Sequence, residues 1–245
     1  MSGGGLLLAG SWVLGQQNNT DLAISWLLPA LACWVAVLWR AYRQLHLNCS
    51  LDGARFYAHL GHGNLLTLLR GFLIASTAGF LAISQRLDAG LFAYLPAVFY
   101  TGAAIGDALD GFLARRQQQI TQLGARLDNE LDALGLVIAP LLAVLIDKLH
   151  ASYLLVSVAY YLFQLGMFWR RRRDKPLYPL PPSRLRRQLA GWQMGLVATC
   201  LWPPIPGEVT RILGVVFMTP LLLGFIRDWL HVSGRRATPP AAQTP

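Results

Sequence analysis

The chain has 245 residues, of which 54% are hydrophobic and only 13% are charged. Soluble domains carry about 25% charged residues, so this composition argues against an ordinary soluble protein and indicates an integral membrane protein. The formal net charge of +9 would suggest a nucleic-acid-binding protein only if the basic residues did not lie between membrane spans. Three widely spaced cysteines form no CxxC pair, which argues against a disulfide framework or a zinc site.

The chain begins with MSGGGLLLAGSWVLG, which lacks a basic n-region and is interpreted as a polar or interfacial lead-in. A transmembrane helix needs about 20 apolar residues. Seven segments are predicted to span the membrane: 22–39, 65–84, 91–114, 127–146, 153–169, 189–202 and 209–230. The sixth is short and stops before PPIP at Pro203, which must break the helix.

Residues 40–64 mix basic, aromatic and apolar side chains, and they are predicted to form an amphipathic helix lying on the membrane surface. The tail from Gly234 is predicted to be disordered. Three regions follow: residues 1–63 with the first span and the interfacial segment, a transmembrane domain over 64–232, and a tail over 233–245.

The arginines and lysines are concentrated in alternate loops, and the loops between those are nearly neutral. By the positive-inside rule, this alternation predicts an outside N-terminus and a cytoplasmic C-terminus. It also explains most of the net positive charge without nucleic acid. The third and fourth spans then meet at the cytoplasmic side of the membrane, which we expect to be a bacterial inner membrane.

Four aspartates occur in the stretch DALDGFLARRQQQITQLGARLDNELD, which links the third and fourth spans. Asp107 and Asp110 are three residues apart, and Asp128 and Asp132 are four apart, so each pair lies on one face of a helix. A short polar link joins the two helices, which predicts that they pack antiparallel and that the four carboxylates converge. The alternative is a set of helix-end charges paired with nearby arginines, but intramembrane carboxylates are usually functional.

Converging carboxylates repel one another and need a counter-charge. Mg²⁺, Mn²⁺ and Ca²⁺ all prefer carboxylate oxygen, and no cluster of Cys or His competes for a softer metal. Carboxylates with Mg²⁺ commonly hold substrate phosphates, and Arg115 is a further candidate to bind a phosphate in this stretch. The residues therefore predict a site for a divalent cation and a phosphate.

The stretch resembles the signature of the CDP-alcohol phosphotransferase family. Eight residues over 26 positions match it: Asp107, Asp110, Gly111, Ala114, Arg115, Gly124, Asp128 and Asp132. Asn64, Thr67 and Arg70 also resemble the Asn-x2-Thr-x2-Arg pattern of the family's first core helix. The family fold has six spans, so the first span of this chain is an addition. The resemblance also implies a homodimer.

The resemblance implies transfer of a substituted phosphoryl group from a CDP-linked donor, here CDP-diacylglycerol, to an alcohol, with release of CMP. Two divalent cations, Mg²⁺ or Mn²⁺, would be bound by Asp107, Asp110, Asp128 and Asp132, and Asp132 would also act as general base. The CDP pocket would be formed by Gly111, Ala114, Arg115 and Gly124, together with Asn64 and Thr67.

The segment PPSRLRRQLAGWQMG bears on the alcohol acceptor. It partly resembles a Ser-x3-Lys-x2-Thr-x2-Gln pattern of phosphatidylglycerophosphate synthases, with Arg187 at the Lys position and Ala190 at the Thr position. Arg187 and Arg211 are therefore candidates to bind an acceptor phosphate. Glycerol 3-phosphate is the first-choice acceptor, and inositol phosphate, phosphatidylglycerol, serine or another polyol are the alternatives.

Two other classes of function remain open from the residues alone. A metal-dependent prenyl transferase also binds a diphosphate with aspartates at helix ends, but it lacks the Gly-x2-Ala-Arg insert of this chain. A cation transporter would place its carboxylates nearer the middle of the membrane. Release of CMP distinguishes the predicted enzyme from both.

Overall fold

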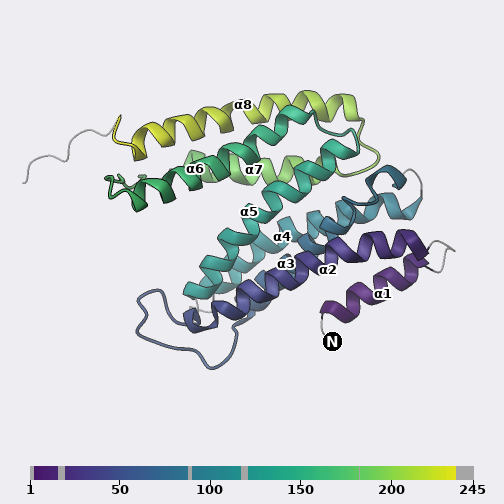
Figure 1. Cartoon of the computed structure of the whole chain (residues 1–245), viewed down its shortest axis with the longest axis horizontal. Helices are drawn as coiled ribbons and strands as arrows, with labels where there is room; N and C mark the ends of the chain where they lie inside the picture. The colour runs from purple at the N-terminus through teal and green to yellow at the C-terminus, as the bar shows by residue number, and fades with distance from the viewer. Residues whose placement is uncertain (1–2, 16–19, 88–89, 117–120, 182, 236–245) are drawn as a thin grey trace, which may run out of the picture.

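The computed structural model of the chain describes all residues except 1–2, 16–19, 88–89, 117–120, 182 and 236–245, and it describes only the backbone of residues 9, 12–15, 91 and 110–116. Within this part the chain forms eight α-helices and no β-strand, which confirms the all-α fold (Figure 1). The helices are α1 (Gly3–Gly15), α2 (Thr20–Arg43), α3 (His62–Gly79), α4 (Leu95–Arg116), α5 (Gln122–Leu145), α6 (Leu154–Arg172), α7 (Arg184–Cys200) and α8 (Gly207–Val232).

The helices α2 to α8 correspond to the seven predicted spans. In the described chain, four stretches are long and apolar enough to cross a membrane, namely Thr20–Arg43, Phe92–Leu109, Ala151–Arg172 and Gly207–Val232. Many large apolar side chains on them, such as Leu28, Leu162 and Ile212, are exposed on the outside of the bundle, as contact with lipid requires. The chain is therefore an integral membrane protein. The predicted helix break also occurs, because α7 ends at Cys200 and α8 begins at Gly207.

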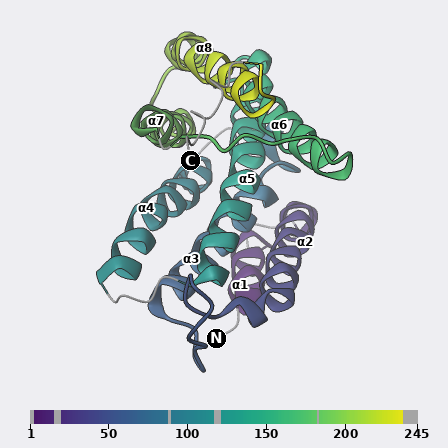
Figure 2. The ribbon, with the colours of Figure 1, turned by 90° about the vertical axis from the view of Figure 1, so that its left-hand side faces the viewer.

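The helix α3 lies at the centre of one group of helices and packs against α2, α4 and α5. Figure 2 shows α5 running from this group to a second group formed by α6, α7 and α8. Small side chains line the contacts in the first group and allow close approach of the helices; they include Ala75, Ala97, Ala103 and Ala139. The central position of α3 differs from the expectation that α4 and α5 pack directly on each other, because the larger interfaces of both are with α3.

One lysine joins the connection between α5 and α6 to the connection between α7 and α8. Lys148, in the connection between α5 and α6, donates hydrogen bonds to the carbonyl oxygens of Trp202 and Pro203, at 3.4 and 3.1 Å. Burial lowers the pKa of its ammonium. These bonds hold the connection between α7 and α8 against the end of α5.

The start of the chain, which the sequence suggests is a polar or interfacial lead-in, forms the helix α1 (Gly3–Gly15). Leu7 is buried, and Gly3 and Gly10 lie against the indole rings of Trp34 and Trp26 on α2. An apolar LLLA run becomes helical here because α2 offers it an aromatic surface to pack on.

The predicted amphipathic helix over residues 40–64 is replaced by a different structure. After α2 ends at Arg43, the chain makes a 3₁₀ turn at Leu45–Leu47 and then an irregular connection up to His62. The side chain of Asn48 donates to the backbone carbonyls of Tyr57 and His59, at 2.9 and 3.2 Å. Asparagine bonds of this kind satisfy backbone groups in a loop and so compete with a helix. Most of the predicted disordered tail lies outside the described residues.

Candidate active site

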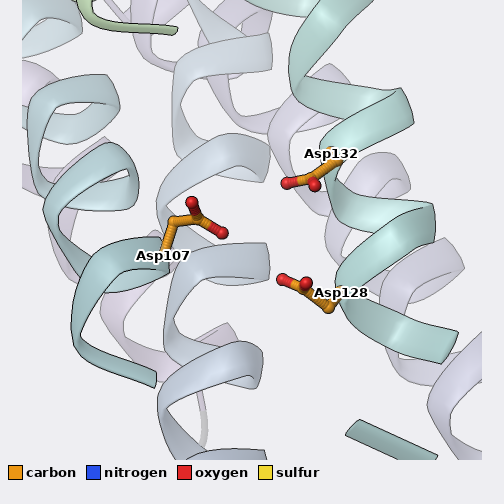
Figure 3. A group of neighbouring side chains, drawn as sticks. All are labelled: Asp107, Asp128 and Asp132. Atoms are coloured by element: carbon orange, nitrogen blue, oxygen red, sulfur yellow. The ribbon is translucent and has the colours of Figure 1, made fainter. Parts of the chain in front are cut away.

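Three of the four aspartates come together between two helices. Asp107 lies on α4, and Asp128 and Asp132 lie one turn apart on α5 (Figure 3). One carboxylate oxygen from each lies within 4.8 Å of the others. The side chains are 37, 38 and 47% exposed, in that order. The three carboxylates are therefore close enough to share a cation and open enough for a ligand to reach them.

Arg70 of α3 lies directly behind the three carboxylates. Its side chain is completely buried, and its Nη2 atom lies 2.9 Å from an oxygen of Asp107 and 2.8 Å from an oxygen of Asp132. Its Nη1 atom donates to Asp128. One guanidinium thus contacts three anions that come from two different helices. Gly106 on α4 makes room for this arginine, since a Cβ there would lie 2.8 Å from the Cγ atom of Arg70.

Sequence reasoning placed Arg70 in a helix pattern but gave it no role in the site. The available signal was its spacing of three from Thr67 and six from Asn64, which puts all three residues near one face of α3. What the pattern did not indicate was that α3 lies between α4 and α5. Because of that position, the arginine becomes the counter-charge of the aspartates.

Asn64 and Gly124, both predicted to bind CDP, are neighbours at the start of α5. Thr121 caps α5, since its hydroxyl accepts from the backbone N–H of Gly124 at 3.0 Å. The same hydroxyl donates to the side-chain oxygen of Asn64 at 2.9 Å. A Cβ at Gly124 would lie 2.5 Å from that oxygen, so only glycine fits here without a shift. Thr67 is buried and donates to the carbonyl of Gly63 at 3.0 Å.

The remaining residues of the motif are Asp110, Gly111, Ala114 and Arg115. Their backbone belongs to α4, and their side chains lie outside the described part of the structure.

A cavity of about 590 Å³ opens from the aspartates. It extends from α5 to α7, α8 and the segment that joins α6 to α7, and most of its wall is apolar. Its polar lining away from the aspartates includes Tyr160, Ser183, Arg186, Arg187, Gln193, Arg227, Asp228 and His231. The cavity thus brings the predicted acceptor segment to the predicted metal site, although more than fifty residues separate them in the chain.

The two predicted acceptor arginines are placed very differently. Arg187 lines the cavity. Arg211 is exposed near the start of α8 and is not among the cavity residues, whereas Arg227 and His231 of the same helix are. The sequence did not single out Arg227 or His231; their signal was a position four residues apart near the end of the last span.

Two other side chains define the polar end of the cavity. Arg186 forms an ion pair with Asp228 at 3.4 Å and donates to the carbonyl of Pro181 at 2.6 Å, so it ties the segment before α7 to α8. Gln193 is buried, and among the described residues its Nε2 atom has no hydrogen-bond partner. A buried amide donor that faces a cavity without a partner is costly unless a ligand or water accepts from it.

Comparison with known proteins identifies one family. A family model described as CDP-alcohol phosphatidyltransferase matches residues 61–226, which include the aspartates and most of the cavity lining. No curated protein and no solved structure matches the chain significantly.

Proposed function

Because the chain belongs to the CDP-alcohol phosphatidyltransferase family and is therefore a transferase of substituted phosphate groups, we propose that it transfers a phosphatidyl group from CDP-diacylglycerol to glycerol 3-phosphate and releases CMP. One observation carries the proposal. A single cavity connects the three aspartates with Arg187 and with Gln193, whose Nε2 atom has no hydrogen-bond partner among the described residues. Such a cavity holds a diphosphate at one end and a polar acceptor at the other.

The aspartates fit divalent cations. Their donors are hard carboxylate oxygens that lie within 4.8 Å of one another, and each carboxylate has a second oxygen to offer. We propose Asp107, Asp110, Asp128 and Asp132 as the ligands of two Mg²⁺ or Mn²⁺ ions. When bound, these ions would neutralise the diphosphate and the departing CMP.

The protein itself supplies position and a base. In the proposed reaction the acceptor hydroxyl oxygen bonds to the phosphatidyl phosphorus, the bond from that phosphorus to the CMP oxygen breaks, and the hydroxyl proton passes to a base. Asp132 is our candidate for that base, because it is the most exposed of the three described aspartates and it borders the cavity. Arg70 holds Asp132 from the buried side, so its carboxylate stays turned toward Asp107 and Asp128.

The acceptor end favours an anionic alcohol. Arg186 is neutralised by Asp228, whereas Arg187 and Arg227 also line the cavity and have no acidic partner among the described ion pairs. A guanidinium is well suited to a phosphate, and glycerol 3-phosphate offers both a phosphate and a free hydroxyl. We assign acceptor binding to Arg187 rather than to Arg211, which does not line the cavity. Inositol phosphate, phosphatidylglycerol, serine and other polyols are the alternative acceptors.

We further propose that the catalytic domain covers residues 64–232 and that the site faces the cytoplasm of a bacterial inner membrane. This orientation follows from the alternation of basic and neutral loops. It would let a lipid donor stay in the membrane while CMP leaves into water. A homodimer is proposed from family membership alone.

The proposal is tested by measuring CMP release from CDP-diacylglycerol by the purified full-length chain, with Mg²⁺, Mn²⁺ or EDTA and a panel of acceptors. Asp132→Asn removes the proposed base. Asp21→Asn is the matched control, because Asp21 is an exposed aspartate in the first turn of α2. We expect release that requires glycerol 3-phosphate and a metal, that is lost in Asp132→Asn, and that persists in Asp21→Asn.

Other outcomes change the proposal in defined ways. Release with a different alcohol keeps the reaction and replaces the acceptor. Pyrophosphate release from a prenyl diphosphate, without CMP release, supports a prenyl transferase instead. Movement of divalent cations across vesicles without turnover of CDP-lipid supports a transporter and refutes the proposed reaction.

A further inference from the structure

The family match begins at residue 61, yet the chain before it makes specific contacts with the helix that carries Asp128 and Asp132. Three sets of contacts reach that helix from the N-terminal extension, which we define as residues 20–60. They involve a glutamate on the back of α5, a glycine beside Arg70, and the cap at the start of α5.

The first contact is made by Glu130, which lies between Asp128 and Asp132 in the sequence but on the opposite side of α5. Glu130 is two residues from Asp128 and two from Asp132, and two residues correspond to about 200° of rotation at 3.6 residues per turn. Its carboxylate therefore points away from the aspartates and toward α2. Arg40 of α2 binds it through Nε and Nη2, at 3.0 and 2.7 Å, and Gln44 donates to it at 2.8 Å.

The geometry of this contact makes it more than an ordinary surface ion pair. Single exposed ion pairs contribute little to stability, but two parallel N–H···O bonds between arginine and a carboxylate also define an orientation. Gln44 adds a third hydrogen bond to Glu130, and Gln44 is buried. Together these bonds resist rotation of α5 about its own axis, and that rotation determines where Asp128 and Asp132 point.

The second contact joins three helices behind the site. Gly71 follows Arg70 on α3, and a Cβ there would lie 2.8 Å from Val37 of α2 and 3.2 Å from Leu131 of α5. Leu131 precedes Asp132 directly. The extension therefore packs against the residue next to the buried guanidinium, and that residue packs in turn against the neighbour of Asp132.

The third contact reaches the first turn of α5. Asn48 accepts a hydrogen bond from the side-chain amide of Asn64 at 3.1 Å, and Asn64 in turn accepts from the capping Thr121 at 2.9 Å. The backbone N–H of Gln122 donates to the carbonyl of Cys49 at 3.0 Å. Asn48, Asn64 and Thr121 are all buried, so these bonds between the extension and the start of α5 are shielded from solvent.

We propose that the N-terminal extension is a positioning element of the site, in which Arg40, Gln44 and Asn48 hold α5 in the rotation that points Asp128 and Asp132 at Asp107. Glu130 is the positioning residue on α5, and it acts through the helix and not by contact with the substrate. This inference rests on the proposed function for what the aspartates bind, and on the contacts alone for how α5 is held.

The decisive comparison uses Glu130→Gln, which keeps the size of the side chain and removes its charge. Arg43→Gln is the matched control, because Arg43 is another arginine in the last turn of α2, is exposed, and lies over the ring of Trp39. The exchanged pair Arg40→Glu with Glu130→Arg tests whether attraction between these two positions is what matters. Asn48→Ala removes the contact at the cap independently.

Two measurements on the full-length protein separate this inference from the proposed function. Hydrogen–deuterium exchange of residues 122–132 reports how firmly α5 is held, with or without activity. The dissociation constant for Mn²⁺, titrated by electron paramagnetic resonance, reports the arrangement of the carboxylates. We expect Glu130→Gln to raise exchange in this segment and to weaken Mn²⁺ binding about 3- to 30-fold, the range typical of coupling through packed elements.

Arg43→Gln should leave both measurements unchanged, Asn48→Ala should raise exchange at residues 122–124, and the exchanged pair should recover most of the lost Mn²⁺ affinity. Unchanged exchange and affinity in Glu130→Gln would overturn the inference, as would an exchanged pair no better than the single variant. If the parent chain binds Mn²⁺ but releases no CMP, the proposed reaction fails and the positioning role stands. If it binds no Mn²⁺, the proposed metal site fails, and the hydrogen–deuterium exchange of Glu130→Gln alone decides whether the extension holds α5.

Discussion

Replacement of Arg70 by methionine is the sharpest perturbation of the site, because one buried guanidinium contacts all three described carboxylates. Methionine keeps a long apolar stem beside Gly106 and removes the charge and the hydrogen bonds. Without the arginine, three carboxylates whose oxygens lie within 4.8 Å of one another would face each other with no counter-charge from the described residues. Removing one partner of a buried ion pair costs about 3–5 kcal/mol.

The lower end of that range applies here, because the carboxylates are partly exposed and water screens their repulsion. A loss of about 3 kcal/mol lowers the melting temperature of a protein of this size by roughly 6–12 °C. Divalent cations at the same carboxylates would supply the missing positive charge. The loss should therefore be large in EDTA and much smaller in saturating Mg²⁺ or Mn²⁺.

The assay is thermal unfolding of the purified chain in detergent, for the parent and for Arg70→Met, in EDTA and across a series of Mg²⁺ concentrations. Arg70→Lys is the matched control, since it keeps one charge but cannot bridge three carboxylates in the same way. It should lie between the other two in EDTA. An Arg70→Met variant that is destabilised equally with and without metal would refute the reasoning, because the arginine would then act through packing and not as a counter-charge.

Three further predictions concern single residues. Asp132→Asn should lower kcat for CMP release by at least about 100-fold, since a general base contributes a factor of about 10²–10⁴ to the rate. CDP-diacylglycerol should still bind in an equilibrium binding assay, and an undiminished kcat would exclude Asp132 as the base. Gly124→Ala should weaken CDP binding, measured by calorimetry, and lower stability by about 1–3 kcal/mol, measured by thermal unfolding, because the added Cβ would lie 2.5 Å from the side-chain oxygen of Asn64. Unaltered stability would show that this contact relaxes freely. Arg187→Gln should raise KM for glycerol 3-phosphate about tenfold or more in steady-state kinetics, and Arg211→Gln should not, since Arg187 lines the cavity and Arg211 does not. Equal effects of the two substitutions on KM would contradict the assignment of Arg187 to the acceptor.

Much of the architecture followed from local properties of the sequence. Seven helices form where seven spans were predicted, and four stretches of the described chain have the length and apolarity that a membrane demands of a helix. The break at Pro203 followed from the missing N–H of proline. The pairing of Asp128 with Asp132 followed from helical periodicity. These predictions needed no knowledge of how the helices pack.

The helix that was not predicted and the predicted helix that does not form are both cases in which a segment's conformation depends on its neighbour. The helix α1 forms against Trp26 and Trp34 of α2, and the connection after Arg43 is irregular because Asn48 bonds to its backbone. The bonds of Asn48 reach residues 9 and 11 positions away, and the indoles that α1 packs on belong to another helix, so a local helical pattern does not reveal either set of contacts. The same reason explains why Arg227 and His231 were missed, since they join the site only through the packing of α8 across the cavity.

The sequence by itself determined the chemistry of this protein: carboxylates at helical spacing in an apolar chain, with the residues of a phosphotransferase motif around them. Side-chain type and periodicity are local, so they can be read without a fold. Only the tertiary structure decided what surrounds that chemistry. It placed α3 between α4 and α5, which made Arg70 the buried counter-charge of three aspartates, and it laid the N-terminal extension against the back of α5. Contacts between distant segments are set by how whole helices pack, and no single stretch of the chain contains that information.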